Sequence, residues 1–339
     1  MKRSGTGRKL LIPSMAALAL FLGACGDPGS SGTKAPENGD EAASGEECEP
    51  IAGDDIITLE DDQELQTVDN VVAAVNGEAA EEDSALLAAV DEVADSLDTQ
   101  LLIELNRAVD IDRQTSSEAA KAFAEEHELT APEQHSGGDS VVVGAANFSE
   151  SATVAELYAI VLEDAGYDVE VRTIGNRELY EPAIESGELT VVPEYVGTFT
   201  EFLNLDANGS DADALASSDL DETMEALEDL ADEAGLAVGA PSEAADQNAY
   251  AVTTDFAEEY GVETLSELAE ACGGGISLGG PPECAERPFC QPGLEDTYGM
   301  TITDLKSLDA GGPLSKSALR SGEVALGMVL SSDAELVTD

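Results

Sequence analysis

The chain has 339 residues and carries 72 acidic against 14 basic side chains, which gives a formal net charge of −58 at pH 7. A surface of this charge repels nucleic acid and anionic membrane surfaces, which argues against either as a binding partner. Because the acidic residues are spread along the sequence, the charge favours a solvated surface suited to high salt over a local recognition patch.

The first 24 residues have the pattern of a bacterial secretion signal. Four basic residues precede an apolar stretch, 10–24, that is short for a membrane-spanning helix. The stretch ends in Leu22-Gly23-Ala24-Cys25, which resembles a lipobox. We predict that residues 1–24 are removed, that Cys25 carries lipid, and that the protein is anchored outside the cytoplasm on the cell membrane. Removing four bases and no acid would take the charge from −58 to −62. A plain secretory signal is the alternative.

Residues 25–50 are rich in Gly, Ser, Pro and acidic side chains, which predicts a flexible tether. Folded structure is expected from about Ile51. Strands are predicted at 56–59 and 70–75, followed by three helices near 84–97, 101–105 and 116–127. A second soft segment, 132–140, contains Gly137-Gly138.

Beyond this segment the pattern becomes an alternation of strands and helices. Strands are predicted at 140–144, 169–173 and 189–192, with helices from about Ser151 to Gly166 and over 178–186. An acidic helix near 220–233 and a strand at 250–253 lead into a second α/β run. The sequence therefore predicts two α/β lobes with parallel sheets and a ligand cleft between them.

Four cysteines remain after Cys25, and an even set outside the cytoplasm favours disulfides. Cys284 and Cys290 share a Pro-rich loop, so their pairing is the first choice, and it leaves Cys48 with Cys272. Four cysteines allow three pairings, and the sequence does not choose among them. No metal site is expected, because the cysteine spacing does not fit zinc and the two histidines, His127 and His135, lie elsewhere in the sequence.

Seven short motifs, in one order, resemble the substrate-binding proteins of osmoprotectant ABC importers, the glycine betaine, choline and carnitine class. They are Asn147-Phe148-Ser149-Glu150, Gly175-Asn176-Arg177-Glu178, Glu185-Ser186-Gly187-Glu188, Pro193-Glu194-Tyr195-Val196-Gly197-Thr198, 246–252, the Cys284–Cys290 loop and 308–314. The resemblance implies a two-lobed periplasmic-binding-protein fold of type II, with a hinge between the lobes.

The resemblance also implies a circular permutation. Family members usually place the segments like Leu59-Glu60-Asp61-Asp62 and Asp69-Asn70-Val71-Val72, with three helices, after the equivalent of Asp333. Here they come first. The expected domains are 51–69 in lobe 2, 70–130 in lobe 1, a linker at 131–139 joining the family's old termini, 140–249 in lobe 1 and 250–339 in lobe 2. A Cys48–Cys272 bond would then tie the new N-terminal strand to lobe 2. The alternative is an unrelated helical module over 51–130.

An osmolyte of this class needs aromatic faces for its quaternary ammonium and N–H groups for its carboxylate. Tyr195 and Tyr250 are the predicted aromatic contacts, and the helix start at 147–151 is the predicted anion contact. The full set of expected ligand residues is Tyr195, Thr198, Tyr250, Asn248, Asn147, Ser149, Asn176, Tyr298 and Asp333. Aromatic residues make up only 4% of the chain, and Val68, Ser315 and Leu330 stand near positions where relatives tend to have aromatics.

The predicted function is therefore capture of a glycine betaine- or choline-like solute and its delivery to membrane permease subunits. Another small polar solute, such as an amino acid or related osmolyte, is the alternative. A hydrolase is disfavoured, because one histidine lies on a predicted helix and the other in a linker, which leaves no Ser-His-Asp set. We expect no catalytic residues, no metal and no cofactor, and a protein that acts as a monomer.

Overall fold

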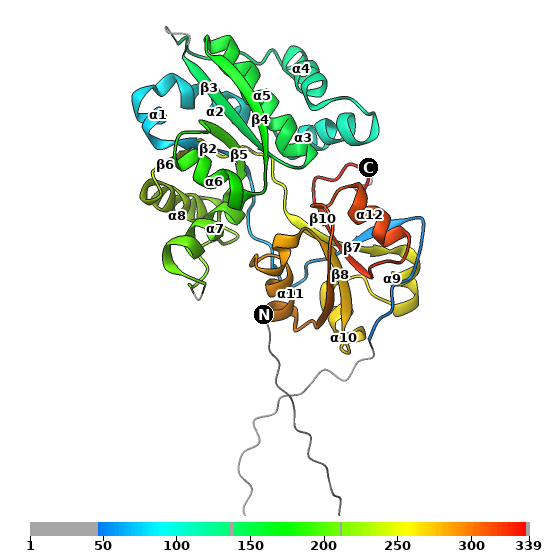
Figure 1. Cartoon of the computed structure of the whole chain (residues 1–339). Helices are drawn as coiled ribbons and strands as arrows, with labels where there is room; N and C mark the ends of the chain where they lie inside the picture. The colour runs from blue at the N-terminus through cyan, green and yellow to red at the C-terminus, as the bar shows by residue number, and fades with distance from the viewer. Residues whose placement is uncertain (1–46, 136–138, 211, 337–339) are drawn as a thin grey trace, which may run out of the picture. The chain divides into compact units, whose positions relative to one another are not determined.

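The computed structural model describes residues 47–135, 139–210 and 212–336. The predicted signal, Cys25 and most of the tether lie outside these residues. Two five-stranded sheets, each with its own helices, form two lobes (Figure 1). The α/β fold class predicted from the sequence is confirmed.

The sheet of lobe 1 has the strand order β4-β3-β5-β2-β6. Its strands are β4 (Asp168–Gly175), β3 (Ser140–Ala146), β5 (Val191–Tyr195), β2 (Val71–Asn76) and β6 (Leu236–Val238). Strand β3 is parallel to β4 and β5, whereas β2 is antiparallel to both of its neighbours. All six residues of β2 are buried, which explains its Val- and Ala-rich sequence.

Helices cover both faces of this sheet. One face packs against α2 (Ser84–Ser96), α3 (Thr99–Asn106), α4 (Ser116–Glu126) and α5 (Ser149–Ala165). The other packs against α6 (Arg177–Glu185), α7 (Val196–Asn208) and α8 (Leu220–Glu233). A short helix, α1 (Gly77–Glu82), and a π-type turn, Arg107–Ile111, were not predicted.

The sheet of lobe 2 has the order β1-β7-β10-β8-β9. Its strands are β1 (Ile56–Leu59), β7 (Asn248–Thr253), β10 (Leu326–Leu330), β8 (Ile276–Gly280) and β9 (Ile302–Ser307). One face packs against α9 (Thr254–Tyr260), α10 (Leu265–Ala271) and α11 (Gln291–Tyr298), and the other against α12 (Pro313–Arg320). Strand β7 is antiparallel to β1 and β10, as β2 is antiparallel to its neighbours in lobe 1.

The chain crosses between the lobes twice within the described residues, before β2 and before β7. The two crossing segments lie side by side: the Asp246 N–H donates to the Asp69 carbonyl at 3.0 Å, and the Val71 N–H to the Ala244 carbonyl at 2.9 Å. Two adjacent strands between compact lobes are a geometry suited to a hinge. The circular permutation inferred from the resemblance stays a prediction.

Both expected disulfides are present in lobe 2. Cys48 is bonded to Cys272 beside β8, and Cys284 to Cys290 in the loop before α11. Among the residues that the structure covers, no helix combines the length and apolar character needed to cross a bilayer.

Candidate functional site

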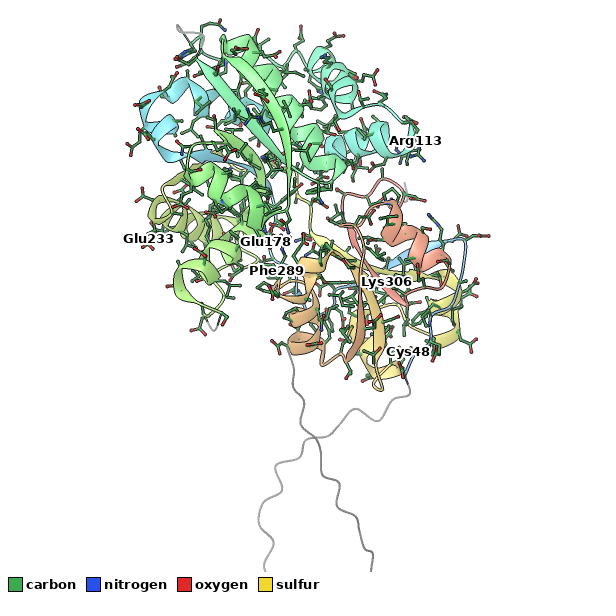
Figure 2. The ribbon with its side chains drawn as sticks, viewed as in Figure 1. Cys48, Arg113, Glu178, Glu233, Phe289 and Lys306 are labelled. Atoms are coloured by element: carbon green, nitrogen blue, oxygen red, sulfur yellow. A yellow bond between two sulfur atoms is a disulfide. The ribbon has the colours of Figure 1, made fainter. Side chains whose placement is uncertain are left out.

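A cavity of about 370 Å³ lies between the lobes. Lobe 1 contributes the starts of α5, α6 and α7, and lobe 2 contributes the Cys284–Cys290 loop and the end of β10. Figure 2 labels one residue from each side, Glu178 on α6 and Phe289 in the disulfide loop, and they lie near each other. The cavity therefore depends on residues of both lobes.

Three helices begin at this cavity because three parallel strands end there. Strands β3, β4 and β5 lead into α5, α6 and α7, whose N-cap residues Phe148, Asn176 and Tyr195 all line the cavity. None of the three caps makes a side-chain bond to its helix. Ligand sites are common at the carboxyl ends of parallel strands, because helix starts and loops meet there.

Aromatic side chains supply much of the wall. Tyr195 is 8% exposed, and its ring centroid lies 6.3 Å from that of Phe148. Phe202 on α7, Phe289 in the disulfide loop and Tyr180 on α6 also line the cavity. Aromatic faces attract ammonium groups that cannot donate hydrogen bonds, by about 0.5–2 kcal/mol per face.

A buried carboxylate fixes the orientation of Tyr195. The Tyr195 hydroxyl donates to Glu150 Oε1 at 2.6 Å, and Glu150 is 2% exposed. Glu150 Oε2 accepts from the Ser332 hydroxyl at 2.6 Å and from Asn106 Nδ2 at 2.5 Å. Because Ser332 follows β10, Glu150 links the aromatic wall of lobe 1 to lobe 2.

A buried ion pair lies at the cavity wall, which one of its members, Arg177, lines. Arg177 donates from Nε and Nη2 to the two oxygens of Glu194, at 2.7 and 2.6 Å, and both side chains are buried. The Tyr180 hydroxyl also donates to Glu194, at 2.7 Å. Arg177 further contacts the carbonyl and hydroxyl of Thr198. The pair positions the starts of α6 and α7 relative to each other.

Two further buried acids, Asp69 and Asp246, lie on the crossing segments and face the cavity. Burial raises the pKa of Asp69 to about 7, against the opposing effect of the hydrogen bond from the Thr198 N–H. Burial also raises the pKa of Asp246 well above its usual value, and the neighbouring Glu150 carboxylate adds to this. Both acids favour a nearby cation, which would compensate their charge.

The raised pKa of Asp69 predicts a pH effect on stability. A proton bound to the folded but not the unfolded carboxyl stabilises the fold at low pH, and this contribution is lost as pH rises from about 4 to about 7. The free energy of unfolding of the wild type, relative to Asp69→Asn, should therefore fall over this range by up to about 4 kcal/mol. Urea titrations of both proteins at pH 4.5, 6 and 8 measure this; a difference that is constant with pH would contradict it.

An ion pair closes one side of the cavity. Arg287, in the disulfide loop, donates to both oxygens of Glu178 at 3.1 and 3.2 Å. Both residues are partly exposed, so the pair contributes on the order of 1 kcal/mol or less to stability. It nonetheless fixes a contact between the lobes beside the cavity.

Five of the predicted ligand residues line the cavity, and four do not. Those that do are Tyr195, Thr198, Asn248, Asn147 and Asn176. Ser149 and Asp333 line a second, smaller cavity of about 200 Å³ instead, where Asp333 is paired with Lys316 at 2.8 Å.

Tyr250 and Tyr298 line neither cavity. Tyr250 is 1% exposed, lies in the core of lobe 2 and donates from its hydroxyl to the Phe289 carbonyl at 2.8 Å. The hydroxyl of Tyr298 is bonded to Asp61. Their rings are packed in the core of lobe 2, so their expected role as direct ligand contacts does not fit this arrangement.

Several residues that line the cavity were not predicted from the sequence as ligand contacts. The aromatic ones are Phe148, Tyr180, Phe202 and Phe289, and the charged ones include Asp69 and Asp246. Phe148, Phe289 and Asp246 fall inside motifs that were singled out for the resemblance, so the motifs marked the site even where the individual residue was not chosen.

A family model described as "Substrate binding domain of ABC-type glycine betaine transport system" matches residues 50–126 and 139–338. The chain belongs to this family. A glycine-betaine-binding protein of Pseudomonas aeruginosa is 30% identical over 208 residues, which cover 58% of this chain and 64% of that protein. The chain thus spans just under two thirds of this relative's length.

Two solved structures are also similar in part. A glycine betaine/carnitine/choline ABC transporter structure has 18% identity and a TM-score of 0.37, covering 57% of this chain and 70% of that one. NikA from Brucella suis, in complex with Fe(III)-EDTA, has 15% identity and a TM-score of 0.28, covering 56% and 47%.

Proposed function

We propose that this protein is the extracytoplasmic solute-binding component of an ABC importer and that it captures a compatible solute with a quaternary amine. The proposal is carried by a cavity between two lobes that two adjacent crossing segments join, lined by aromatic rings and by buried carboxylates. Family membership supports the same role. The predicted lipid on Cys25 would keep the protein at the outer face of the membrane, near its permease.

Capture proceeds by closure of the lobes around the two crossing segments. The solute enters between the disulfide loop and α6, and its ammonium group contacts Tyr195 and the other aromatic rings. Contacts such as Arg287–Glu178 and Ser332–Glu150 then join the lobes around it. The closed form docks on the permease, whose ATPase drives import, and no bond in the solute is broken.

A solute panel tests the proposal. Glycine betaine, choline, carnitine and proline betaine are titrated calorimetrically, with proline as an unmethylated amino acid. At least one quaternary amine should bind and raise the melting temperature by mass action. Tyr195→Ala should weaken that binding at least tenfold, because it removes an aromatic face. Binding of proline alone would favour the amino-acid alternative, and no binding of any quaternary amine would contradict the proposal.

We propose also that the chain is a circular permutant of its family. In lobe 1, the chain runs through β3, β4, β5 and β6 before it crosses to lobe 2 at β7. In lobe 2, the matching series is β8, β9, β10 and β1, followed by the crossing to lobe 1 at β2. Because β1 comes first in this chain, the two series match only if the end of the chain after β10 is joined to the segment before β1. The two ends support this, because Arg320 contacts both the Asp54 carbonyl and the Glu335 carboxylate. A chain rejoined there and opened at the 131–139 linker should fold with the same solute affinity; failure to fold would count against it.

A further inference from the structure

The charged residues that line the cavity are mostly acidic. There are seven carboxylates and two guanidinium groups: Asp69, Glu178, Glu201, Asp206, Asp246, Glu283 and Glu286 against Arg177 and Arg287. An excess of negative charge at a site with low-dielectric walls raises the local concentration of cations and lowers that of anions. A solute that carries a carboxylate would need a positive group at the cavity wall that is not already paired with the protein.

Both arginines of the cavity are already paired. Arg177 is committed to Glu194 and Thr198, and its exposed fraction is 6%. Arg287 is bonded to Glu178 and lies 3.9 Å from Glu283. A solute carboxylate would therefore have to displace a carboxylate of the protein to reach either guanidinium group.

The helix starts that face the cavity are the other positive groups, and each has a protein carboxylate beside it. The first turn of α5 contains Glu150, whose oxygens accept from Tyr195, Ser332 and Asn106, and that of α6 contains Glu178, whose oxygens accept from Arg287. At the start of α7, the Thr198 N–H donates to Asp69 at 2.9 Å. A helix start is equivalent to about half a positive charge, so the Asp69 carboxylate is enough to balance that of α7. The acids in the first turns of α5 and α6 weaken the attraction of those two helix starts for an anion.

Asp69 and Asp246, by contrast, retain an oxygen for the solute. In each, Oδ1 accepts the hydrogen bonds from the protein, from Thr198 for Asp69 and from Ser331 and Ser332 for Asp246. Oδ2 of each makes no hydrogen bond within the described part of the chain and is not among its fully buried unsatisfied atoms. The backbone bond between these two residues keeps the carboxylates close together.

We propose that the cavity selects a quaternary ammonium cation that has no carboxylate, of which choline is the simplest form, over a zwitterion such as glycine betaine. This inference rests on the proposed function and narrows its substrate class. The cation is held by aromatic faces and by Asp69 and Asp246. A carboxylate on the solute finds no unpaired guanidinium group and is repelled by the acids around it.

Choline and glycine betaine form a matched pair of probes, because they share the trimethylammonium group and differ in a hydroxymethyl group against a carboxylate. Calorimetry at pH 8, above the pKa of about 7 that burial gives Asp69, and at one ionic strength should give choline an affinity at least tenfold higher, which is about 1.4 kcal/mol. Equal or tighter binding of glycine betaine would overturn the inference and leave the proposed function intact. Failure of every quaternary amine to bind would overturn the function itself.

Asp246→Asn separates charge selection from general binding. It should weaken choline binding at least tenfold while changing glycine betaine binding by less than threefold. The matched control is Asp232→Asn, which removes the same charge from an exposed position at the end of α8 and should alter neither affinity. Equal losses for both probes in Asp246→Asn would overturn the inference. If that variant does not fold, judged by its thermal transition, Asp69→Asn takes its place with the same expected outcomes.

Discussion

Replacing Arg177 with Met should lower the free energy of unfolding by about 3–5 kcal/mol, because it leaves the Glu194 carboxylate buried without its cation. Glu194 is fully buried, and its remaining partners are the Tyr180 hydroxyl and the Tyr195 N–H. Neither donor carries a charge, so they do not replace the guanidinium group. The loss is expected in urea titrations at pH 7, with solute binding reduced as well because the starts of α6 and α7 shift.

Arg172→Met is the matched control. Arg172 also makes two hydrogen bonds to a carboxylate, that of Glu170, but both side chains are exposed, with 39% and 62% of their surfaces accessible. Solvent and salt screen an exposed pair of this kind, so this variant should remain close to the wild type in its free energy of unfolding. A loss in Arg177→Met as small as that in Arg172→Met would refute the importance assigned to the buried pair.

The disulfide between Cys48 and Cys272 is expected to stabilise the protein by about 5 kcal/mol in the chain-entropy model, near the upper limit for such bonds. It joins residues separated by 224 positions and so constrains most of the unfolded chain. Replacing both cysteines with Ala should therefore give a large fall in the free energy of unfolding. It should leave solute affinity nearly unchanged, since neither cysteine lines the cavity.

The second disulfide provides the opposite pattern. Cys284 and Cys290 are separated by 6 positions, for which the same model gives only about 2 kcal/mol. Their loop, however, holds Phe289 and Arg287 at the cavity wall. Replacing this pair with Ala should therefore cost more in the free energy of solute binding than in the free energy of unfolding. Equal effects of the two replacements on stability would contradict the loop-length argument.

Elements with a strong local signal were predicted well from the sequence. Strand β2 was expected at 70–75 and is observed at Val71–Asn76, because a strand buried on both faces is a continuous apolar run. Helix α5 ends at Ala165, and the residue that caps it is the predicted stop, Gly166, whose φ of 107° is accessible to glycine at little cost. Helix α1 was missed because it buries none of its side chains and so has no apolar period.

The site was only partly predictable, because it depends on distances between segments far apart in the sequence. Tyr195 was chosen for its position at a strand end, and it lines the cavity. Asn248 and Tyr250 lie on the same face of β7, two residues apart. Only Asn248 lines the cavity, because the Tyr250 side chain is packed in the core of lobe 2, where its hydroxyl donates to the Phe289 carbonyl. Asp69 and Asp246 become neighbours only when the two crossing segments pair, which no local pattern encodes.

A crystal structure of the protein with choline at saturating concentration would show directly whether a quaternary ammonium cation binds between the lobes. We predict density for one cation between the lobes, with its ammonium group against Tyr195 and within reach of Asp69 and Asp246, and with Phe289 of the disulfide loop closing the opposite side. A cavity that stays empty at that concentration, or a cation bound by one lobe alone on the protein surface, would show that the two lobes do not capture this solute between them.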